Sequence, residues 1–380
     1  MTKTLKYRLF PTKKQERLLQ EQLNECCWLY NYLLEERRDT WEKEKKSINY
    51  FQQCNSIPDL KKERPSLNNV YSQVLQNVAD RVDKAFQGFF RRVKAKNGKA
   101  GYPRFKGFDR YDSFTYKQAG FGWQIKDKHL QLSKIGSIKI KLHRSIIGTL
   151  KTCTIRRQAG KWYACFSVDY EPEPLPKSNK AVGIDVGLEN FATFSTKEKI
   201  ANPRFFKTDQ KALAKAQRKL SKQDKLSLER KKAKKVVIRI HERIANRRHN
   251  FIHQETRKVV NRFGIICAED LSINKLKRNN FRSINKGIGD VAWAQFANVL
   301  SHKAEEAGRQ FIAVDPKGTS QRCSQCGTIV EKTLATRWHD CPICNCHLHR
   351  DLNASLNILR LGLQSLGIQS VEAPDFSRGE

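Results

Sequence analysis

The chain has 380 residues, and its 73 Lys and Arg outnumber its 38 Asp and Glu to give a formal charge of +35. No apolar stretch approaches the roughly 20 residues needed to cross a membrane, and the N-terminus lacks the apolar core of a signal peptide, so neither a membrane-spanning nor a secreted protein is expected. So large a positive excess repels itself without a polyanionic partner, which predicts nucleic-acid binding; a merely basic surface is the alternative.

The first part of the chain is predicted to be a small β-structure with a helical insertion. Residues 4–10 alternate as a half-buried strand, and Thr12 and Gln15 form a capping box that opens a helix. Residues 12 to about 95 are predicted to be helical. From residue 113 the apolar period changes to two, with Ile138, Ile140 and Leu142 inward, and residues 158–161 predict a hairpin turn. One small β-barrel interrupted by a helical lobe is the resulting prediction.

The acidic, proline-rich segment 171–176 is the clearest predicted domain boundary. Beyond it, residues 181–185 and 191–195 predict the first hairpin of a mixed α/β sheet. Residues 208–260 predict a long, intensely basic helical region that either tracks a phosphate backbone or is simply a solvated face. A helix is expected from Asp290 to about Glu306, and a strand over 311–314.

Three acidic residues follow predicted elements of this second part. Asp185 and Glu269 each close a short apolar run, and Asp351 follows a cysteine-rich module. Carboxylates at the C-terminal ends of neighbouring buried strands would repel each other unless a divalent cation lay between them, which favours Mg²⁺ or Mn²⁺ and phosphodiester hydrolysis. Taken singly, Asp351 could merely cap a helix, and Glu269 could begin one.

Two Cys-x-x-Cys pairs, separated by fourteen residues, have the spacing of a zinc ribbon: Cys323, Cys326, Cys341 and Cys344. Four thiolates at this spacing can close a tetrahedral shell around one structural Zn²⁺. Cys346, His347 and His349 lie just beyond and leave a replacement ligand open. Six other cysteines are scattered along the chain, which favours a reducing cytoplasm over a disulfide framework.

Motifs along almost the whole chain resemble the OrfB/TnpB proteins of bacterial insertion sequences. They comprise Tyr7–Thr12, Gly101–Lys106, Gly183–Gly187, Ala268–Leu271, Thr319–Gly327, Arg337–Cys344 and His349–Ala354. Their order and spacing are compatible with the family. One departure is Asn345-Cys346, where a glycine often follows the second cysteine pair, and this affects only the local ribbon turn.

The resemblance implies a multidomain α+β protein, in which a β-barrel with a helical insertion precedes an RNase H-like (RuvC) α/β nuclease domain with an inserted zinc ribbon. The expected parts are a β-barrel (1–10 and 108–172), a helical recognition lobe (11–107), a nuclease domain (173–317, completed by a helix at 349–365), a ribbon (318–348) and a disordered tail (366–380).

The resemblance also implies an RNA-guided DNA endonuclease, related to type V CRISPR effectors, that cuts double-stranded DNA beside a short target-adjacent motif. Asp185, Glu269 and Asp351 would hold two Mg²⁺ ions, with Asp185 bridging them. Its expected partners are a guide RNA from the transposon end and target DNA, with no membrane, and a monomer or weak dimer is expected in a bacterial or archaeal cytoplasm. Arg337 or Arg350 could neutralise charge in the transition state.

Residues that contact nucleic acid are expected on one helix, one strand and the basic region. They are Ser72, Gln73, Gln76, Ser113, Phe114, Thr115, Tyr116, Arg243 and Arg247. Amides and hydroxyls suit base edges, and Phe114 or Tyr116 could stack on a base; ordinary helix surface and a barrel strand are the alternative. A catalytically inactive guided DNA-binding protein and a strand-transfer transposase remain rival functions.

Overall fold

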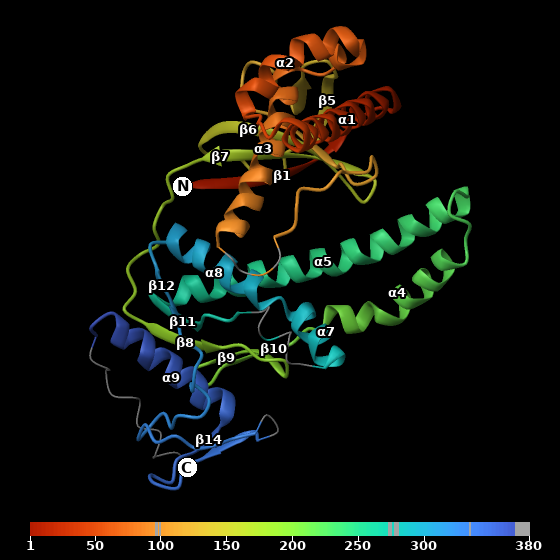
Figure 1. Ribbon diagram of the computed structural model, residues 1–380. Helices are drawn as coiled ribbons and strands as arrows, with labels where there is room; N and C mark the ends of the chain where they lie inside the picture. The colour runs from red at the N-terminus through yellow and green to blue at the C-terminus, as the bar shows by residue number, and fades with distance from the viewer. Residues whose placement is uncertain (96–97, 99, 273–275, 277–280, 334–335, 369–380) are drawn as a thin grey trace. The chain divides into compact units, whose positions relative to one another are not determined.

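The protein is described by a computed structural model that covers residues 1–380 except 96–97, 99, 273–275, 277–280, 334–335 and 369–380 (Figure 1). The chain divides into two compact units, Met1–Glu171 and Pro172–Glu380, at the acidic, proline-rich segment. The expected disordered tail, 366–380, lies mostly outside the described residues. Among the helices that the structure describes, none is long and apolar enough to cross a membrane.

The first unit contains one antiparallel sheet and a group of helices. In chain order its elements are β1 (Thr2–Phe10), α1 (Lys13–Glu44), α2 (Tyr50–Glu63), the 3₁₀ helix η1 (Pro65–Asn69), α3 (Ser72–Lys94), β2 (Ser113–Tyr116), β3 (Trp123–Lys126), β4 (His129–Leu132), β5 (Gly136–Lys141), β6 (Thr149–Gln158) and β7 (Lys161–Asp169). Thr12 and Gln15 form the predicted capping box at the start of α1.

The sheet has the strand order β2-β6-β7-β1-β5-β4-β3. The first strand therefore returns to the middle of the later ones, with Leu5 opposite Phe166 and Leu9 opposite Ile140. The sheet curls strongly. Three strands separate β3 from β7, yet Trp123 on β3 stacks on Phe166 of β7 with their ring centroids 5.2 Å apart.

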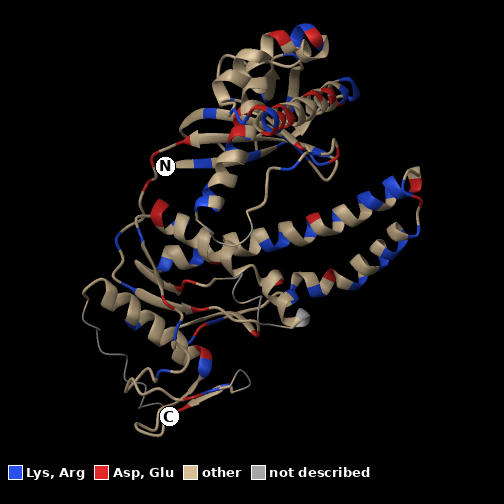
Figure 2. Cartoon of the chain, in the orientation of Figure 1, with Lys and Arg blue, Asp and Glu red and all other residues tan. Residues whose placement is uncertain are grey.

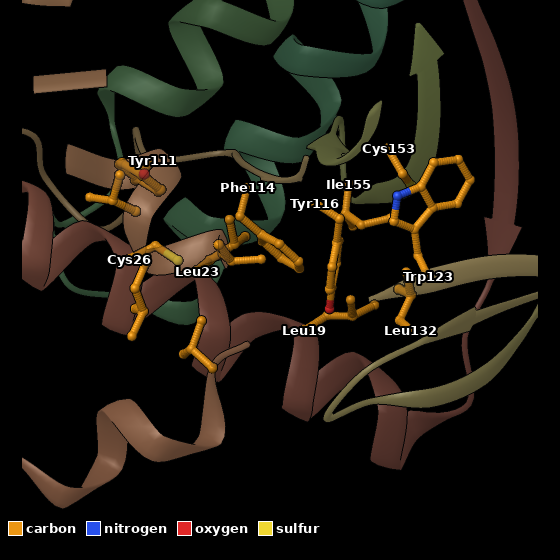
Figure 3. Close-up of a cluster of buried hydrophobic side chains, with 14 of the residues drawn as sticks. Leu19, Leu23, Cys26, Tyr111, Phe114, Tyr116, Trp123, Leu132, Cys153 and Ile155 are labelled. Carbon is orange, nitrogen blue, oxygen red and sulfur yellow. The ribbon is translucent and has the colours of Figure 1, made fainter. Parts of the chain in front are cut away.

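The concave face of this sheet is covered by α1 and α3. Figure 3 shows Leu19 and Leu23 of α1 beside Phe114 and Tyr116 of β2, all of them buried. Arg81 of α3 fixes the helix to the same strand by donating to the Ser113 carbonyl at 2.6 Å and to Thr115 Oγ1 at 2.9 Å. Leu142, expected to point inward, is exposed, because β5 ends one residue before it.

The second unit is built on a mixed five-stranded sheet. Its elements are β8 (Ala181–Asp185), β9 (Asn190–Phe194), β10 (Lys199–Ala201), α4 (Phe205–Ser221), α5 (Leu228–Arg262), β11 (Ile265–Glu269), α7 (Arg282–Val291), α8 (Trp293–Glu306), β12 (Gln310–Val314), β13 (Trp338–Asp340), β14 (His347–His349) and α9 (Arg350–Ser365). The order is β10-β9-β8-β11-β12, with β8, β11 and β12 parallel and β9 antiparallel to β8.

Helices cover both faces of this sheet, with α5 and α8 on one side and α9 on the other (Figure 1). Val182 and Ile184 join the apolar cluster of α5 and α8, whereas Cys267 packs against Ile358 of α9. The helix α9 lies very close to β8 at Gly183, where the absence of a side chain permits the approach. A Cβ added there would lie 2.0 Å from the Ser355 carbonyl oxygen. Apolar residues on both faces explain why these strands read as short apolar runs.

One predicted helix boundary is wrong. Ala292, at φ 57°, breaks the chain between α7 and α8, so the helix expected from Asp290 begins at Trp293. Asp290 belongs to α7, where its carboxylate accepts the Phe206 amide at the start of α4 and pairs with Arg248 of α5 at 2.8 Å. Asp290 therefore joins three helices from within α7 and does not start α8.

Candidate functional site

Asp185 lies at the C-terminal end of β8, next to the C-terminal end of the parallel strand β11. Burial, together with the nearby charges of Glu269 and Asp351, raises the pKa of Asp185 well above its ordinary value, and the charge of Arg350 opposes this shift. The structure therefore brings the three acidic residues close enough for both partners to act on the Asp185 carboxyl.

Glu269 ends β11, and its carboxylate is held by a residue fifty positions later. Thr319 Oγ1 donates to Glu269 Oε1 at 2.5 Å and to the Pro316 carbonyl at 3.1 Å. Burial raises the pKa of Glu269, and the bond from Thr319 opposes that rise by stabilising the charged form. Thr319 was not predicted as a site residue; its place just before the first cysteine of the ribbon was the available signal.

Asp351 lies in the first turn of α9, where negative charge interacts favourably with the helix dipole. The cap itself is His349, whose Nδ1 accepts the Asp351 amide at 3.3 Å and lies 3.8 Å from Asp351 Oδ2. The capping alternative for the Asp351 side chain is therefore wrong, and its carboxylate remains available. Arg350 donates to the Thr333 carbonyl at 3.0 Å, and Arg337 lies 3.7 Å from Glu189.

Two buried asparagines of α9 attach the cysteine module to this site. Asn357 Nδ2 donates to the Thr319 carbonyl at 2.9 Å and to the Arg322 carbonyl at 2.6 Å. Asn353 donates to the same Arg322 carbonyl at 2.8 Å and accepts the Ser324 amide at 2.9 Å. The helix that carries Asp351 thus also holds the segment from which Thr319 reaches Glu269.

The four predicted cysteines converge. Their Sγ atoms all lie within 4.8 Å of one another, with Cys323 and Cys344 3.6 Å apart and Cys326 and Cys341 3.4 Å apart. Hydrogen bonding to Thr328 lowers the pKa of Cys326 to about 6, which favours the thiolate that binds metal. Four sulfurs in this arrangement fit a tetrahedral Zn²⁺ site.

The residues just beyond the four cysteines have other partners. His347 Nδ1 lies against the Asp340 carboxylate, and His349 caps α9. Cys346 is buried beside the four cysteines but does not belong to the converging group. The paired cysteines are therefore the set that fits zinc.

The acidic group has the ligand chemistry of a hard divalent cation, although among the described residues the four cysteines are the group whose ligand atoms converge. Carboxylate oxygens are the ligands that Mg²⁺ prefers, and burial together with mutual repulsion makes this group costly to ionise without a cation. Burial and the charges of Glu269 and Asp351 raise the pKa of Asp185, as expected for a carboxyl that is costly to ionise there. Asp185, Glu269 and Asp351 are the residues that could hold the ion.

The residues expected to contact nucleic acid in the first unit lie along α3 and β2, but not all are accessible. Ser72 and Gln76 are exposed, Gln73 Nε2 donates to Gln118 Oε1 at 2.8 Å, and Ser113 and Thr115 are partly buried under Arg81. Phe114 and Tyr116 are fully buried in the core (Figure 3), so the expectation that either ring stacks on a base is corrected.

An aromatic side chain near these residues was missed. Phe121 is 78% exposed between Gly120 and Gly122, and Tyr71 Oη donates to its carbonyl at 3.3 Å. A Cβ on Gly122 would meet the Tyr71 ring at 2.5 Å, so the turn is packed closely while the Phe121 ring faces solvent. The flanking glycines were the only sequence signal.

Arg243 and Arg247 lie on α5 and both face Asp209 of α4. Their guanidinium groups are 2.7 Å and 3.3 Å from its carboxylate, which is itself buried. Each arginine side chain remains about half exposed. These two residues therefore join the helices, and their outer surfaces stay open to solvent.

Three family descriptions match the sequence. "Probable transposase" matches residues 165–280, "Cas12f1-like, TNB domain" matches residues 293–358, and "Helix-turn-helix domain" matches residues 1–46. The last segment folds here as the strand β1 followed by the single long helix α1.

Several known sequences are similar to this chain, two of them over most of its length. "Putative RNA-guided DNA endonuclease" of Streptomyces pristinaespiralis is 33% identical, covering 95% of this chain and 89% of its own. InsQ of Escherichia coli K12, which carries the same description, is 29% identical, covering 94% and 91%. "CRISPR-associated endodeoxyribonuclease Cas12f1" of Sulfoacidibacillus thermotolerans is 26% identical, covering 56% and 53%.

A solved structure shares the fold. "Structure of the mini-RNA-guided endonuclease CRISPR-Cas_phi3" aligns with a TM-score of 0.51 at 10% identity, covering 96% of this chain and 92% of that one. At this identity the similarity concerns the α+β multidomain architecture alone.

Proposed function

Because the chain belongs to the OrfB/TnpB family of insertion-sequence proteins, we propose that it is an RNA-guided DNA endonuclease that cleaves double-stranded DNA beside a short target-adjacent motif. The observation that most supports cleavage is that the charges of Glu269 and Asp351 both raise the pKa of the Asp185 carboxyl. A protein that only binds DNA has no need for three carboxylates that destabilise one another.

We assign the finer architecture by the same reasoning. The curled sheet of the first unit, with α1 to α3, is a wedge-like β-barrel and helical recognition lobe. The five-stranded sheet with α9 is an RNase H-like (RuvC) nuclease domain, and residues 318–348 are its zinc ribbon. The mixed strand order, with the two antiparallel pairs β10–β9 and β9–β8 next to the parallel strands β8, β11 and β12, supports the nuclease assignment.

The side chains of the site have separate tasks in this proposal. Divalent Mg²⁺, held by Asp185, Glu269 and Asp351, would supply charge stabilisation and water activation for phosphodiester hydrolysis. Thr319 keeps one oxygen of Glu269 engaged and so orients the carboxylate. Arg350, whose charge reaches Asp185, is positioned to offset negative charge that develops on the scissile phosphate.

The guide and the target would be bound by the rest of the chain. A formal charge of +35 matches a polyanion, and base pairing with a guide RNA would then select the sequence. Ser72 and Gln76 are the exposed polar residues of α3 that we assign to the target-adjacent motif, with Gln73 beside them.

The decisive experiment expresses the protein with its flanking transposon DNA and sequences the RNA that co-purifies. A discrete structured RNA with a variable end is expected, and the reconstituted complex should linearise a plasmid that carries the matching target. Asp185→Ala should retain the RNA and lose cleavage. Absence of a discrete RNA from folded, zinc-loaded protein would contradict guiding, and strand-transfer products would indicate a transposase instead.

A further inference from the structure

The helices α4 and α5 form an antiparallel hairpin that extends from the five-stranded sheet (Figure 1). Leu213 of α4 packs against Ile240 and Ile244 of α5, and Asp209 pairs with two arginines near the base. This apolar seam ends before the turn at residues 222–227, so the tip is not part of any apolar core.

The tip is nevertheless well braced by hydrogen bonds. Arg230 Nη1 donates to the Leu220 carbonyl at 3.0 Å and to the Gln223 carbonyl at 2.9 Å. Ser227 Oγ donates to the Asp224 carbonyl at 2.9 Å and accepts the Arg230 amide at 3.1 Å as the cap of α5. The side chains on this turn are therefore presented on a defined backbone.

Two leucines are presented there to solvent. Leu226 is 93% exposed and Leu228 is 69% exposed. Burying a leucine side chain against a partner removes apolar surface from water, so a pair on one braced turn is a strong apolar contact site. An isolated exposed leucine would need no explanation, but two side chains at the end of a rigid projection do.

The charge around the tip identifies the kind of partner. Between residues 205 and 262 the sequence has nineteen Lys and Arg against five Asp and Glu. Three of the five acids are already paired within the hairpin: Asp209, Glu229 and Glu255. Figure 2 shows the remaining positive charge along both helices, and exposed lysines surround the tip: Lys219, Lys222, Lys225, Lys231 and Lys232.

We propose that Leu226 and Leu228 are an apolar wedge that enters a base step of double-stranded DNA while the surrounding lysines hold its phosphates. Aliphatic side chains are known to unstack base steps in this way, and a basic stem supplies the backbone contacts that a wedge requires. The seventeen residues of α4 span about 25 Å, enough to follow the backbone over several base pairs. The inference rests on the proposed function only in taking duplex DNA as the substrate.

The test uses the full-length chain with Asp185→Ala, without added Mg²⁺, so that no DNA is cut. The probe is a 20-base-pair DNA duplex with 2-aminopurine at a central TA step, whose fluorescence rises when the base is unstacked. The tip variant Leu226→Ser/Leu228→Ser is compared with Val236→Ser/Ile238→Ser, which removes two exposed apolar side chains, 48% and 36% exposed, from the stem of the same helix.

We expect the parent protein, which keeps both tip leucines, to raise the fluorescence of the duplex. The tip variant should cause no such rise. Its affinity should fall about tenfold, with an unchanged dependence on salt because every lysine remains. The stem variant should behave like the parent, and equal melting temperatures would show that both variants are folded.

The wedge is refuted if the tip and stem variants unstack the duplex equally, if only an RNA duplex of the same sequence responds, or if the tip leucines matter only for binding to anionic vesicles. Guided cleavage by the unmodified enzyme separates the two claims. Guided cleavage without any effect of the tip variant would refute the wedge proposal alone. An effect of the tip variant without guided cleavage would refute the proposed nuclease activity alone.

Discussion

Thr319 Oγ1 donates a hydrogen bond to Glu269 Oε1 at 2.5 Å, which connects the entrance of the cysteine module to the end of a sheet strand. The Thr319 carbonyl in turn accepts Asn357 of α9, the helix that carries Asp351. The threonine therefore links two of the three acidic positions.

Replacing Thr319 by Val should weaken divalent-metal binding. Without the hydroxyl, the pKa of the buried Glu269 rises further and its carboxylate loses its orientation, so the Mg²⁺ concentration for half-maximal cleavage should increase about tenfold. Thr319→Ser keeps the hydroxyl and should stay close to wild type. An equal response of the two variants would show that the methyl packing matters and the hydrogen bond does not.

Asp185→Asn should stabilise the metal-free protein near neutral pH. Burial and two neighbouring carboxylates raise the pKa of Asp185 in the folded state, whereas an unfolded aspartate titrates near about 3.9. The folded state thus holds its proton to higher pH, and the stability from this group is lost as pH rises from about 4 through the raised value.

Melting temperature measured against pH, with zinc retained and Mg²⁺ omitted, checks this expectation. The variant should melt about 2–4 °C higher than wild type at pH 7.5 for each kcal/mol relieved. Added Mg²⁺ should raise the melting temperature of the wild type and not of the variant. A variant that melts lower in metal-free buffer would mean that the Asp185 carboxylate contributes stability by itself.

Cys323→Ser should lower both zinc content and folding yield, because the buried cluster of the small module consists largely of cysteines and its folding depends on the metal. Zinc per chain, measured by plasma mass spectrometry, should fall well below one. Cys346→Ser is the matched control, since Cys346 is buried beside the site but lies outside the four converging sulfurs. If Cys346→Ser lost zinc and Cys323→Ser did not, Cys346 would be a zinc ligand in place of Cys323.

Gly183→Ala should destabilise the second unit by about 1–3 kcal/mol, because the new methyl meets the Ser355 carbonyl of α9 and the helix must move. Gly88→Ala, inside α3 with its nearest neighbour at 3.6 Å, should instead stabilise by about 0.5–1 kcal/mol. Urea unfolding measures both. A neutral Gly183 variant would show that α9 can shift at little cost.

Local patterns predicted much of this structure. The alternation in residues 4–10, the capping box at Thr12 and the turn at residues 158–161 each correspond to an observed element, because each depends on residues close in sequence. The four cysteines converge as their spacing required. Asp185 and Glu269 were singled out because each closes a short apolar run, and Asp351 because it follows the cysteine-rich module.

Contacts between residues far apart in the chain could not be predicted from the sequence. Phe114 and Tyr116 looked like stacking residues, and only the packing of α1 against β2 shows that they are core. Thr319 and Glu269 lie fifty residues apart, so no periodic pattern connects them. The helix expected from Asp290 begins at Trp293, and the partners of Asp290 come from α4 and α5.

The close approach of α9 to Gly183 also constrains how far Asp351 and Asp185 can lie from that contact along their own helix and strand. From Ser355 back to Asp351 the helix rises about 6 Å, and from Gly183 forward to Asp185 the strand rises about 6.6 Å. The two spacings are similar, which agrees with the charge of Asp351 acting on the Asp185 carboxyl. One residue inserted between Asp351 and Ser355 would turn Asp351 by about 100° around the helix. Length changes among relatives are therefore expected within the cysteine module, and not within this single helical turn.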